Sequence, residues 1–299
     1  MDGKKLLLIV NPRSGKLRSR GPLFDAMCVL CDAGWLVKLH LTAGPGDAAE
    51  TAAAEGADYD AVICVGGDGT LNETVSGLME LKSPPPLGYF PRGSTNDFAA
   101  SLRIPLDPVQ AARAAVSAAP RRLDVGRWNR RSFIYVASFG AFVRSSYAAP
   151  QEAKNALGHF AYILEGMKDL NTLRPYRLRL TADGERLDGE YLFGAVCNST
   201  SIGGLMKLDP DRVVLDDGKF EMVLIPSPRS AGELNDLIRA LLNQEYDRGG
   251  LVFRHVSSVQ VEPEEELPWS LDGEYAPAAA AVTIENRRQA LAFLLGGTE

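Results

Sequence analysis

A glycine-rich run with a single carboxylate is the segment of this sequence that most clearly suggests chemistry. It reads V-G-G-D-G-T-L-N-E over residues 65–73, between a short apolar stretch and a helical pattern. Glycines let a ligand approach the backbone closely, and the N–H groups of the loop and of the helix N-terminus favour a phosphate group. Asp68 would repel a nucleotide unless a cation lay between them, so the run predicts a phosphate site with Mg²⁺. A tight glycine turn with Asp68 as the helix N-cap is the plain structural alternative.

Two further loops rich in small polar residues follow other predicted strands. N-P-R-S-G-K spans residues 11–16, and P-R-G-S-T-N-D-F-A spans residues 91–99. In an open α/β sheet, ligands bind beyond the carboxyl ends of the strands, so the three loops together predict one site. Neither the Walker A motif nor G-x-G-x-x-G is present, which disfavours P-loop ATPases and dinucleotide dehydrogenases.

The elements that must position these loops alternate along the first 120 residues. Strands are predicted at 4–10, 35–41, 61–65 and 87–90, and helices at 23–31, 47–55, 71–81, 96–102 and 108–119. Strands that alternate with helices indicate a mainly parallel sheet covered on both faces, which is a three-layer α/β domain.

Beyond this region the pattern changes to strands that are paired through turns. Strands are predicted at 123–128, 132–138, 176–181, 186–196, 219–225, 251–260 and 281–285, and helices at 151–169 and 229–244. Turn signals at 129–130 and 183–184 support such pairing. We therefore predict a nucleotide-binding α/β domain at 1–122 and a β-rich, antiparallel sandwich-like domain at 123–299. The extreme C-terminus could pack back on the first domain.

Composition narrows the classes of protein that fit this chain. Its 32 Lys and Arg residues against 38 Asp and Glu residues give a net charge of −6, so a generally basic surface that binds nucleic acid is excluded. No stretch approaches the roughly 20 apolar residues that span a bilayer, so no transmembrane segment is expected. Four cysteines are too few for a disulfide framework, and Cys28 and Cys31 are expected to be buried thiols of one helix. These features predict a cytoplasmic protein.

Taken together, the three loops resemble the diacylglycerol kinase catalytic-domain family, in particular its bacterial soluble lipid kinases. The matching segments are Thr42 with G-D-A at 46–48, G-G-D-G-T-L-N-E at 66–73, G-S-T-N-D-F-A at 93–99, L-D-V-G at 123–126, S-I-G-G at 201–204, D-D-G at 216–218 and L-D-G-E at 271–274. A lone G-G-D-G-T is shared with NAD kinases and phosphofructokinases. Its combination with N-D-F-A and a late D-G-E is far more specific.

The resemblance implies an ATP- and Mg²⁺-dependent lipid kinase of phospholipid metabolism that phosphorylates a hydroxyl group of diacylglycerol or a related lipid. It implies that Asp68 is tied to Mg-ATP, and that Glu274 is the general base that removes the proton from the acceptor. The nucleotide-binding positions that it implies are Asn11, Pro12, Arg13, Ser14, Gly15, Thr42, Gly66, Gly67, Asp68, Gly69, Thr70, Leu71, Asn72, Ser94, Asn96 and Asp97. ATP is expected in the cleft between the two domains. Ser94 stands where the family usually has Thr, which keeps the hydroxyl group.

Metal ligands also follow from the resemblance. Asp97 and Asp124 match carboxylates of a magnesium–water network. Asp217, with the main-chain carbonyl groups of Val214 and Lys219, matches a structural magnesium site. Both D-D-G and D-G-E are also ordinary turns, and D-G-E occurs a second time at 188–190. Only the position of the D-G-E at 272–274 in the order of the family's motifs favours it over the D-G-E at 188–190.

A lipid kinase of this kind contacts its substrate at a membrane surface. The segment 103–131 concentrates basic residues, namely Arg103, Arg113, Arg121, Arg122, Arg127, Arg130 and Arg131. These could attract an anionic leaflet or form an ordinary solvated surface. The segment 139–162 has few charges and could line an acyl cleft or belong to the core. The sequence leaves the oligomeric state open, a homodimer included.

Two other functions share these motifs. An NAD kinase or a sugar-phosphate kinase would use the same glycine loop with a soluble acceptor. A non-catalytic regulator would bind a nucleotide or a lipid without turnover. The presence of Asp68, Asn96, Asp97 and Glu274 argues against the regulator, because binding alone does not need a base.

Overall fold

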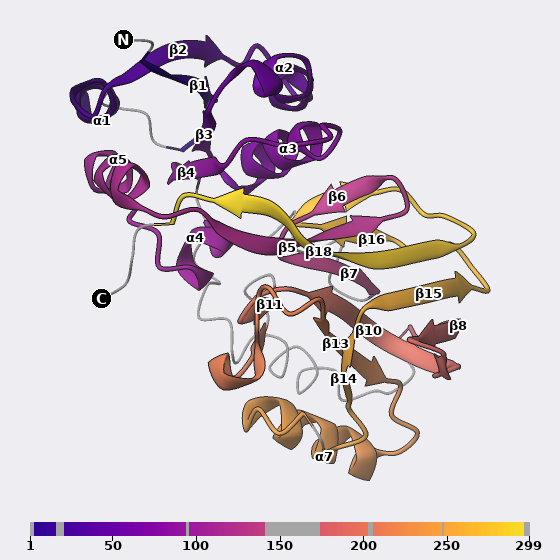
Figure 1. The fold of residues 1–299 in the computed structure, drawn as a ribbon. Coiled ribbons are helices and arrows are strands. Elements are labelled where there is room, and N and C mark those ends of the chain that lie inside the picture. The colour runs from indigo at the N-terminus through magenta and orange to yellow at the C-terminus, as the bar shows by residue number, and fades with distance from the viewer. Residues whose placement is uncertain are drawn as a thin grey trace. The chain divides into compact units, whose positions relative to one another are not determined.

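The computed structural model describes residues 3–15, 21–93, 96–140, 174–202, 206–246 and 248–295. The chain divides into two compact units, which comprise residues 1–125 with 289–299 and residues 126–288 (Figure 1). Each unit has its own hydrophobic core. Two strands, β5 (Arg121–Trp128) and β18 (Val282–Phe293), contain residues of both units.

The first unit is built on a parallel sheet. Its strands are β1 (Lys4–Val10), β2 (Trp35–Leu41), β3 (Ala61–Gly66) and β4 (Leu87–Pro91), in the order β4-β3-β1-β2. All of these neighbours pair in parallel. The end of β18 adds a further parallel strand through Phe293, which lies opposite Leu87. Strand β3 is buried along its whole length, as is typical of a strand between two helical layers.

Helices cover both faces of this sheet. They are α1 (Gly21–Asp32), α2 (Asp47–Glu55), α3 (Asp68–Leu78), α4 (Asp97–Ser101) and α5 (Pro108–Ser117), with a short 3-10 helix at Gly56–Asp58. Figure 1 shows α1 and α5 on one face and α2 and α3 on the other. Helices α2 and α3 pack so closely that a Cβ atom on Gly77 would lie 2.1 Å from the carbonyl oxygen of Ala49.

The expectation that Cys28 and Cys31 are buried is wrong. Both side chains are exposed. Helix α1 buries Ala26 and Leu30 against the sheet, and the two cysteines lie off that face. Helix α1 therefore contains more apolar residues than its sheet-facing side can bury.

The second unit is an antiparallel, β-rich domain. Its elements are β6 (Arg131–Phe133), β7 (Val136–Gly140), β8 (Tyr176–Ala182), β9 (Glu185–Arg186), β10 (Gly189–Cys197), β11 (Ser201–Ile202), β12 (Met206–Lys207), β13 (Phe220–Pro226), β14 (Val252–Val256), β15 (Ser258–Pro263), β16 (Trp269–Leu271), β17 (Glu274–Ala276), helix α7 (Ala231–Leu242) and a 3-10 helix at Pro210–Arg212. The main strand order is β17-β16-β7-β10-β8-β15-β18, with β13 paired to β10 and β14 to β13. The predicted fold class is thus confirmed in both halves.

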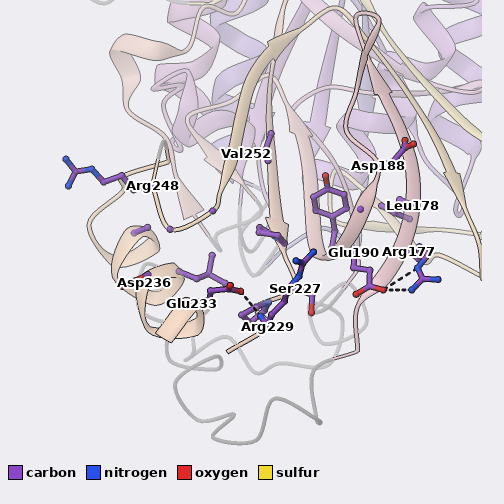
Figure 2. A pocket seen from close by; sticks show the side chains of 18 of the residues that line it. Arg177, Leu178, Asp188, Glu190, Ser227, Arg229, Glu233, Asp236, Arg248 and Val252 are labelled. Atoms are coloured by element: carbon purple, nitrogen blue, oxygen red, sulfur yellow. Dashed lines mark hydrogen bonds and ion pairs between the residues drawn. The ribbon is translucent and has the colours of Figure 1, made fainter. Parts of the chain in front are cut away.

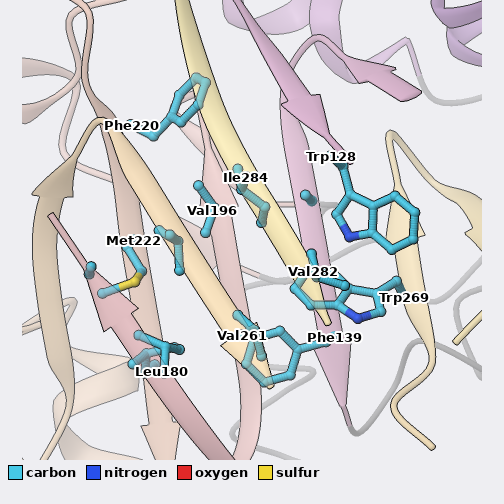
Figure 3. Close-up of a cluster of buried hydrophobic side chains, with 14 of the residues drawn as sticks. Trp128, Phe139, Leu180, Val196, Phe220, Met222, Val261, Trp269, Val282 and Ile284 are labelled. Atoms are coloured by element: carbon cyan, nitrogen blue, oxygen red, sulfur yellow. The ribbon is translucent and has the colours of Figure 1, made fainter. Parts of the chain in front are cut away.

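Aromatic and aliphatic side chains together fill the core of the second unit (Figure 3). Trp269 is fully buried and lies 4.9 Å from Phe139 and 5.9 Å from Trp128, measured between ring centroids. Such tilted and edge-on pairs stabilise a core beyond the burial of their area. They hold β16, which leads into the D-G-E turn, against β7.

The segment 186–196, predicted as a single strand, spans β9 and β10, and two further such segments are also divided. The segment 132–138 separates into β6 and β7, and the segment 251–260 separates into β14 and β15. At the first break, the N–H groups of Ile134 and Tyr135 bind the Asp272 carboxylate instead of a neighbouring strand. At the second, the N–H group of Ser257 binds the Asp183 carboxylate.

Candidate functional site

The glycine run 65–73 forms the turn from β3 into α3. Strand β3 ends at Gly66, and Gly67 is the N-cap of α3 with an extended backbone. As a glycine N-cap, Gly67 offers no side chain to the first N–H groups of the helix. These groups and the positive end of the helix dipole therefore face the loop, which suits an anion.

Glycines allow the loops at three strand ends to pack against one another in the first unit. A Cβ atom on Gly93 would lie 2.6 Å from the Cα atom of Gly67. A Cβ atom on Gly15 would lie 1.9 Å from the carbonyl oxygen of Arg92, and Gly15 also has a φ of 63°. No residue with a side chain fits these contacts without movement of the backbone. The loops after β1, β3 and β4 therefore form one backbone-lined surface.

Hydrogen bonds fasten the loops together. The N–H group of Arg92 donates to the carbonyl oxygen of Gly66 at 2.7 Å, and Nδ2 of Asn11 donates to Oγ1 of Thr70 at 3.0 Å. Thr42, which follows β2, donates its N–H group to the carbonyl oxygen of Val10 at 2.9 Å. The structure thus brings the predicted nucleotide-binding positions after β1, β2 and β3 to one edge of the sheet.

Asn96 and Tyr89 organise the loop after β4. Asn96 has a left-handed backbone with a φ of 53°, accepts the N–H group of Gly93 at 2.8 Å and donates to the Gly93 carbonyl oxygen at 2.9 Å. The buried hydroxyl group of Tyr89 donates to the carbonyl oxygen of Gly66 at 3.2 Å. Tyr89 was not singled out in the sequence because an aromatic residue in an apolar strand is typical of core packing.

Asp68 and Asp97, two of the predicted site residues, are in contact beside this surface. The N–H group of Asp97, the first residue of α4, donates to Oδ2 of Asp68 at 3.2 Å. Burial raises the pKa of Tyr89 well above its ordinary value, and the negative charges of Asp68 and Asp97 raise it further. Two carboxylates in one environment form a negative site whose hard oxygen atoms suit Mg²⁺.

Asp124 is held apart from solvent. Its side chain is 1% exposed, and Oδ1 accepts the N–H group of Gln289 at 2.7 Å. Over the described residues, no three His, Cys, Asp or Glu side chains are grouped as ligands of one metal ion. Each of the carboxylates of Asp68, Asp97 and Asp124 is a hard oxygen ligand of the type that Mg²⁺ prefers, and water would supply the remaining ligands of an ion held by any of them.

In the second unit, hydrogen bonds and an ion pair hold the turn predicted to bind a structural magnesium ion. The N–H group of Lys219 donates to Oδ1 of Asp217 at 2.8 Å, and Gly218 has a φ of 86°. Oγ of Ser257 donates to the Gly218 carbonyl oxygen at 3.1 Å, and Nζ of Lys219 lies 3.0 Å from Asp183. One carboxylate with nearby main-chain carbonyl groups fits a hard cation by donor type.

The D-G-E turn at 272–274 joins β16 to β17. Asp272 and Gly273 both have positive φ angles, as a two-residue hairpin turn requires. Asp272 is 2% exposed, and its carboxylate accepts the N–H groups of Ile134, Tyr135 and Val136 at 2.7–3.0 Å. Glu274 is exposed. The motif alone indicates no separate role for Asp272, because its partners lie more than 130 residues away along the chain.

Several predicted features lie outside the described residues. Among them are Ser94, the helix at 151–169, positions 141–162 of the segment with few charges, and Gly203 and Gly204. Within the basic segment, all of the arginines except Arg127 are exposed. In the part of the chain that the structure describes, no helix is both long and apolar enough to cross a membrane.

The second unit also contains a cavity that the sequence did not predict (Figure 2). It has a volume of about 1330 Å³ and lies between α7 and the ends of β8, β10 and β13. An ion pair between Arg177 and Glu190 at 2.6 Å lies on one wall. Glu233 on the other wall accepts the N–H group of Arg229 at 2.7 Å. Charges of both signs line this cavity, and they favour no single class of ligand.

Comparison with known proteins covers both units. Residues 5–128 match the family model described as the diacylglycerol kinase catalytic domain, and residues 136–295 match the YegS C-terminal NAD kinase beta sandwich-like domain. The chain is 34% identical over 275 residues to a diacylglycerol kinase of Bacillus subtilis (strain 168), which covers 91% of this chain and 90% of that protein. A diacylglycerol kinase of Staphylococcus aureus (strain bovine RF122 / ET3-1) is 33% identical and covers 91% and 86%.

The same fold occurs in a crystal structure of a diacylglycerol kinase from Bacillus anthracis (strain Sterne). The TM-score is 0.78, with 24% sequence identity, over 99% of this chain and 98% of that one. At this identity the likeness concerns the fold.

Proposed function

Because the chain belongs to the diacylglycerol kinase catalytic-domain family, we propose that it transfers the γ-phosphate of ATP to a hydroxyl group of diacylglycerol or a related lipid. The observation that carries the proposal is the close approach of the loops at Gly15, Gly67 and Gly93 beside the N-terminus of α3, where Asp68 is the first helical residue. Backbone donors at a helix N-terminus are suited to the phosphates of a nucleotide.

In this proposal the nucleotide lies along the loops after β1 to β4, and Mg²⁺ is held beside it. Asp68 and Asp97, with Asp124, would supply the oxygen ligands of the ion or of its bound water. When bound, Mg²⁺ neutralises part of the charge of the phosphates during transfer. Asp217 and the carbonyl groups of Val214 and Lys219 would hold a second, structural ion.

Glu274 is the proposed general base. It lies on the exposed turn that Asp272 anchors, so its main chain is fixed while its carboxylate can meet an acceptor. A carboxylate in hydrogen-bond reach of the attacking hydroxyl accepts its proton as the bond to phosphorus forms. The acceptor lipid would be reached at a membrane surface, where the exposed arginines of the segment 103–131 provide positive charge.

The test is phosphoryl transfer from labelled ATP to vesicles that contain diacylglycerol, sphingoid bases or phosphatidylglycerol. We expect a labelled lipid from wild-type protein with Mg²⁺, and a fall in kcat of at least about 100-fold for Glu274→Gln with the affinity for ATP retained. Glu190→Gln is the matched control, since Glu190 ends the other D-G-E tripeptide. Equal turnover by both variants would remove Glu274 from the mechanism, and absence of any labelled lipid would refute the proposal.

A second candidate is a kinase with a soluble acceptor. It is favoured by one observation, the match of the second unit to a sandwich domain named after NAD kinase. NAD and fructose 6-phosphate, offered as acceptors in the same assay, distinguish it from the lipid kinase. A labelled soluble product with no labelled lipid would favour this candidate.

A further inference from the structure

Glu73 ends the G-G-D-G-T-L-N-E run and has no part in the proposal above. It lies on α3, and its Oε1 accepts the N–H group of Gly46 at 2.8 Å. Gly46 is the N-cap of α2, has a φ of 87° and offers no side chain to cap that helix. A carboxylate from the neighbouring helix therefore binds the main chain where α2 begins, which also places negative charge at the positive end of the α2 dipole.

The segment 42–46 is fastened at three points. At its start, the N–H group of Thr42 donates to the carbonyl oxygen of Val10 on β1. In its middle, the N–H group of Ala43 donates to Oδ2 of Asp47 at 2.6 Å. At its end lies the bond to Glu73. Of these three bonds, only the last comes from the helix that begins in the glycine loop.

We infer that Glu73 is a positioning residue, which locks the segment 42–46 to α3 so that this segment and the glycine loop meet a nucleotide as one preformed surface. The inference rests on the proposed binding of a nucleotide. Hydrogen bonds to a charged group are stronger than neutral ones, and a surface that is ordered before binding loses less entropy when the ligand arrives. The contact of Gly77 with Ala49 keeps α2 and α3 together elsewhere, so loss of Glu73 affects the segment and not the packing of the helices.

The test compares Glu73→Ala with Glu73→Gln, whose amide oxygen can still accept the Gly46 N–H group. Glu80→Ala is the matched control. Glu80 is exposed just after α3, and its substitution removes the same charge as Glu73→Ala. Hydrogen exchange of the Gly46 amide is measured without ligand, and the affinity for a fluorescent ATP analogue is measured by direct titration. Thermal unfolding shows that each variant is folded.

We expect Glu73→Ala to speed exchange at Gly46 and to weaken binding of the analogue about ten-fold, with the KM for the lipid unchanged. Glu73→Gln should recover most of the affinity, and Glu80→Ala should match the wild type. Unchanged exchange at Gly46, or unchanged affinity in Glu73→Ala, would overturn the inference. Failure of the wild-type protein to bind the analogue would instead refute the proposed function, while the exchange rates would still decide whether Glu73 holds the segment.

Discussion

Asp272 is a buried residue of the second unit whose carboxylate accepts three consecutive main-chain N–H groups. The groups of Ile134 and Tyr135 lie between β6 and β7, and the third belongs to Val136 at the start of β7. The N–H group of Asp272 in turn donates to the carbonyl oxygen of Val136 at 2.8 Å. The residue thus substitutes for a missing sheet partner and holds the turn that carries Glu274. A residue that appears in the motif as part of a simple turn is therefore structural, and in the proposed mechanism it also positions Glu274.

We predict that Asp272→Ala lowers the free energy of unfolding by about 3 kcal/mol or more, because buried N–H groups lose their acceptor. Denaturant unfolding measures the loss. Asp188→Ala is the matched control in the other D-G-E tripeptide. Asp188 forms an exposed ion pair with Arg186, so this substitution should lower the free energy of unfolding by about 1 kcal/mol or less. Similar losses for the two variants would contradict the anchoring role of Asp272.

The elements of the first unit could be predicted from the sequence, and the breaks in the second could not. Alternation of apolar runs and helical spacing is local, so it predicted β1 to β4 and the helices between them. The interruptions after β6 and β14 come from Asp272 and Asp183, which lie far away along the chain. For the same reason the glycine loops were predicted, whereas the contributions of Tyr89 and Glu73 were not. Tyr89 of β4 contacts Gly66, and Glu73 of α3 contacts Gly46, and each contact forms only in the folded chain.

The loop after β1 provides a test of how tightly the strand ends are packed. We predict that Gly15→Ala destabilises the protein by about 2–3 kcal/mol and abolishes most nucleotide binding, because its Cβ atom would meet the Arg92 carbonyl oxygen. Gly34→Ala is the control, since Gly34 has a φ of 86° but nothing within 4 Å of a Cβ atom. It isolates the backbone strain, which should cost about 1 kcal/mol. Thermal unfolding and titration with an ATP analogue measure both effects.

The turn between β8 and β9 predicts a dependence of stability on pH. Burial raises the pKa of Asp183, but the N–H groups of Ser257 and Ser258 and the Lys219 ammonium group outweigh it and hold the pKa below its ordinary value. Because the pKa is lower in the folded state, the ionised group stabilises the protein above the unfolded pKa of about 3.9. This stabilisation is lost as the pH falls through the folded value.

Asp183→Asn should therefore be less stable than the wild type by about 1 kcal/mol at pH 7, and the difference should shrink as the pH falls below about 4. Asparagine keeps an oxygen that can accept the N–H groups of Ser257 and Ser258, so the variant isolates the charge. Denaturant unfolding at a series of pH values measures the difference. A difference that stayed constant down to the lowest pH would contradict this account.

The two units share strands, and this has a consequence for the unfolding of the whole chain. Strand β18 pairs with β15 in the second unit and with β4 in the first, and β5 also contains residues of both. Both strands run from one unit into the other without an intervening loop, so loss of pairing in one unit would fray the same strand in the other. We expect the chain to unfold in a single cooperative transition, so that a ligand of the first unit stabilises the second as well.

Tryptophan fluorescence tests this coupling, because Trp128 and Trp269 lie in the core of the second unit and only Trp35 lies in the first. Mg-ATP at about 100 times its Kd should add about 2.7 kcal/mol and raise the unfolding midpoint by about 4 °C. Since the proposed nucleotide loops belong to the first unit, the fluorescence midpoint should rise together with the midpoint from circular dichroism. ATP with EDTA, which removes Mg²⁺, should raise both midpoints less than Mg-ATP does. A rise seen by circular dichroism alone would mean that the units unfold independently despite the strands that they share.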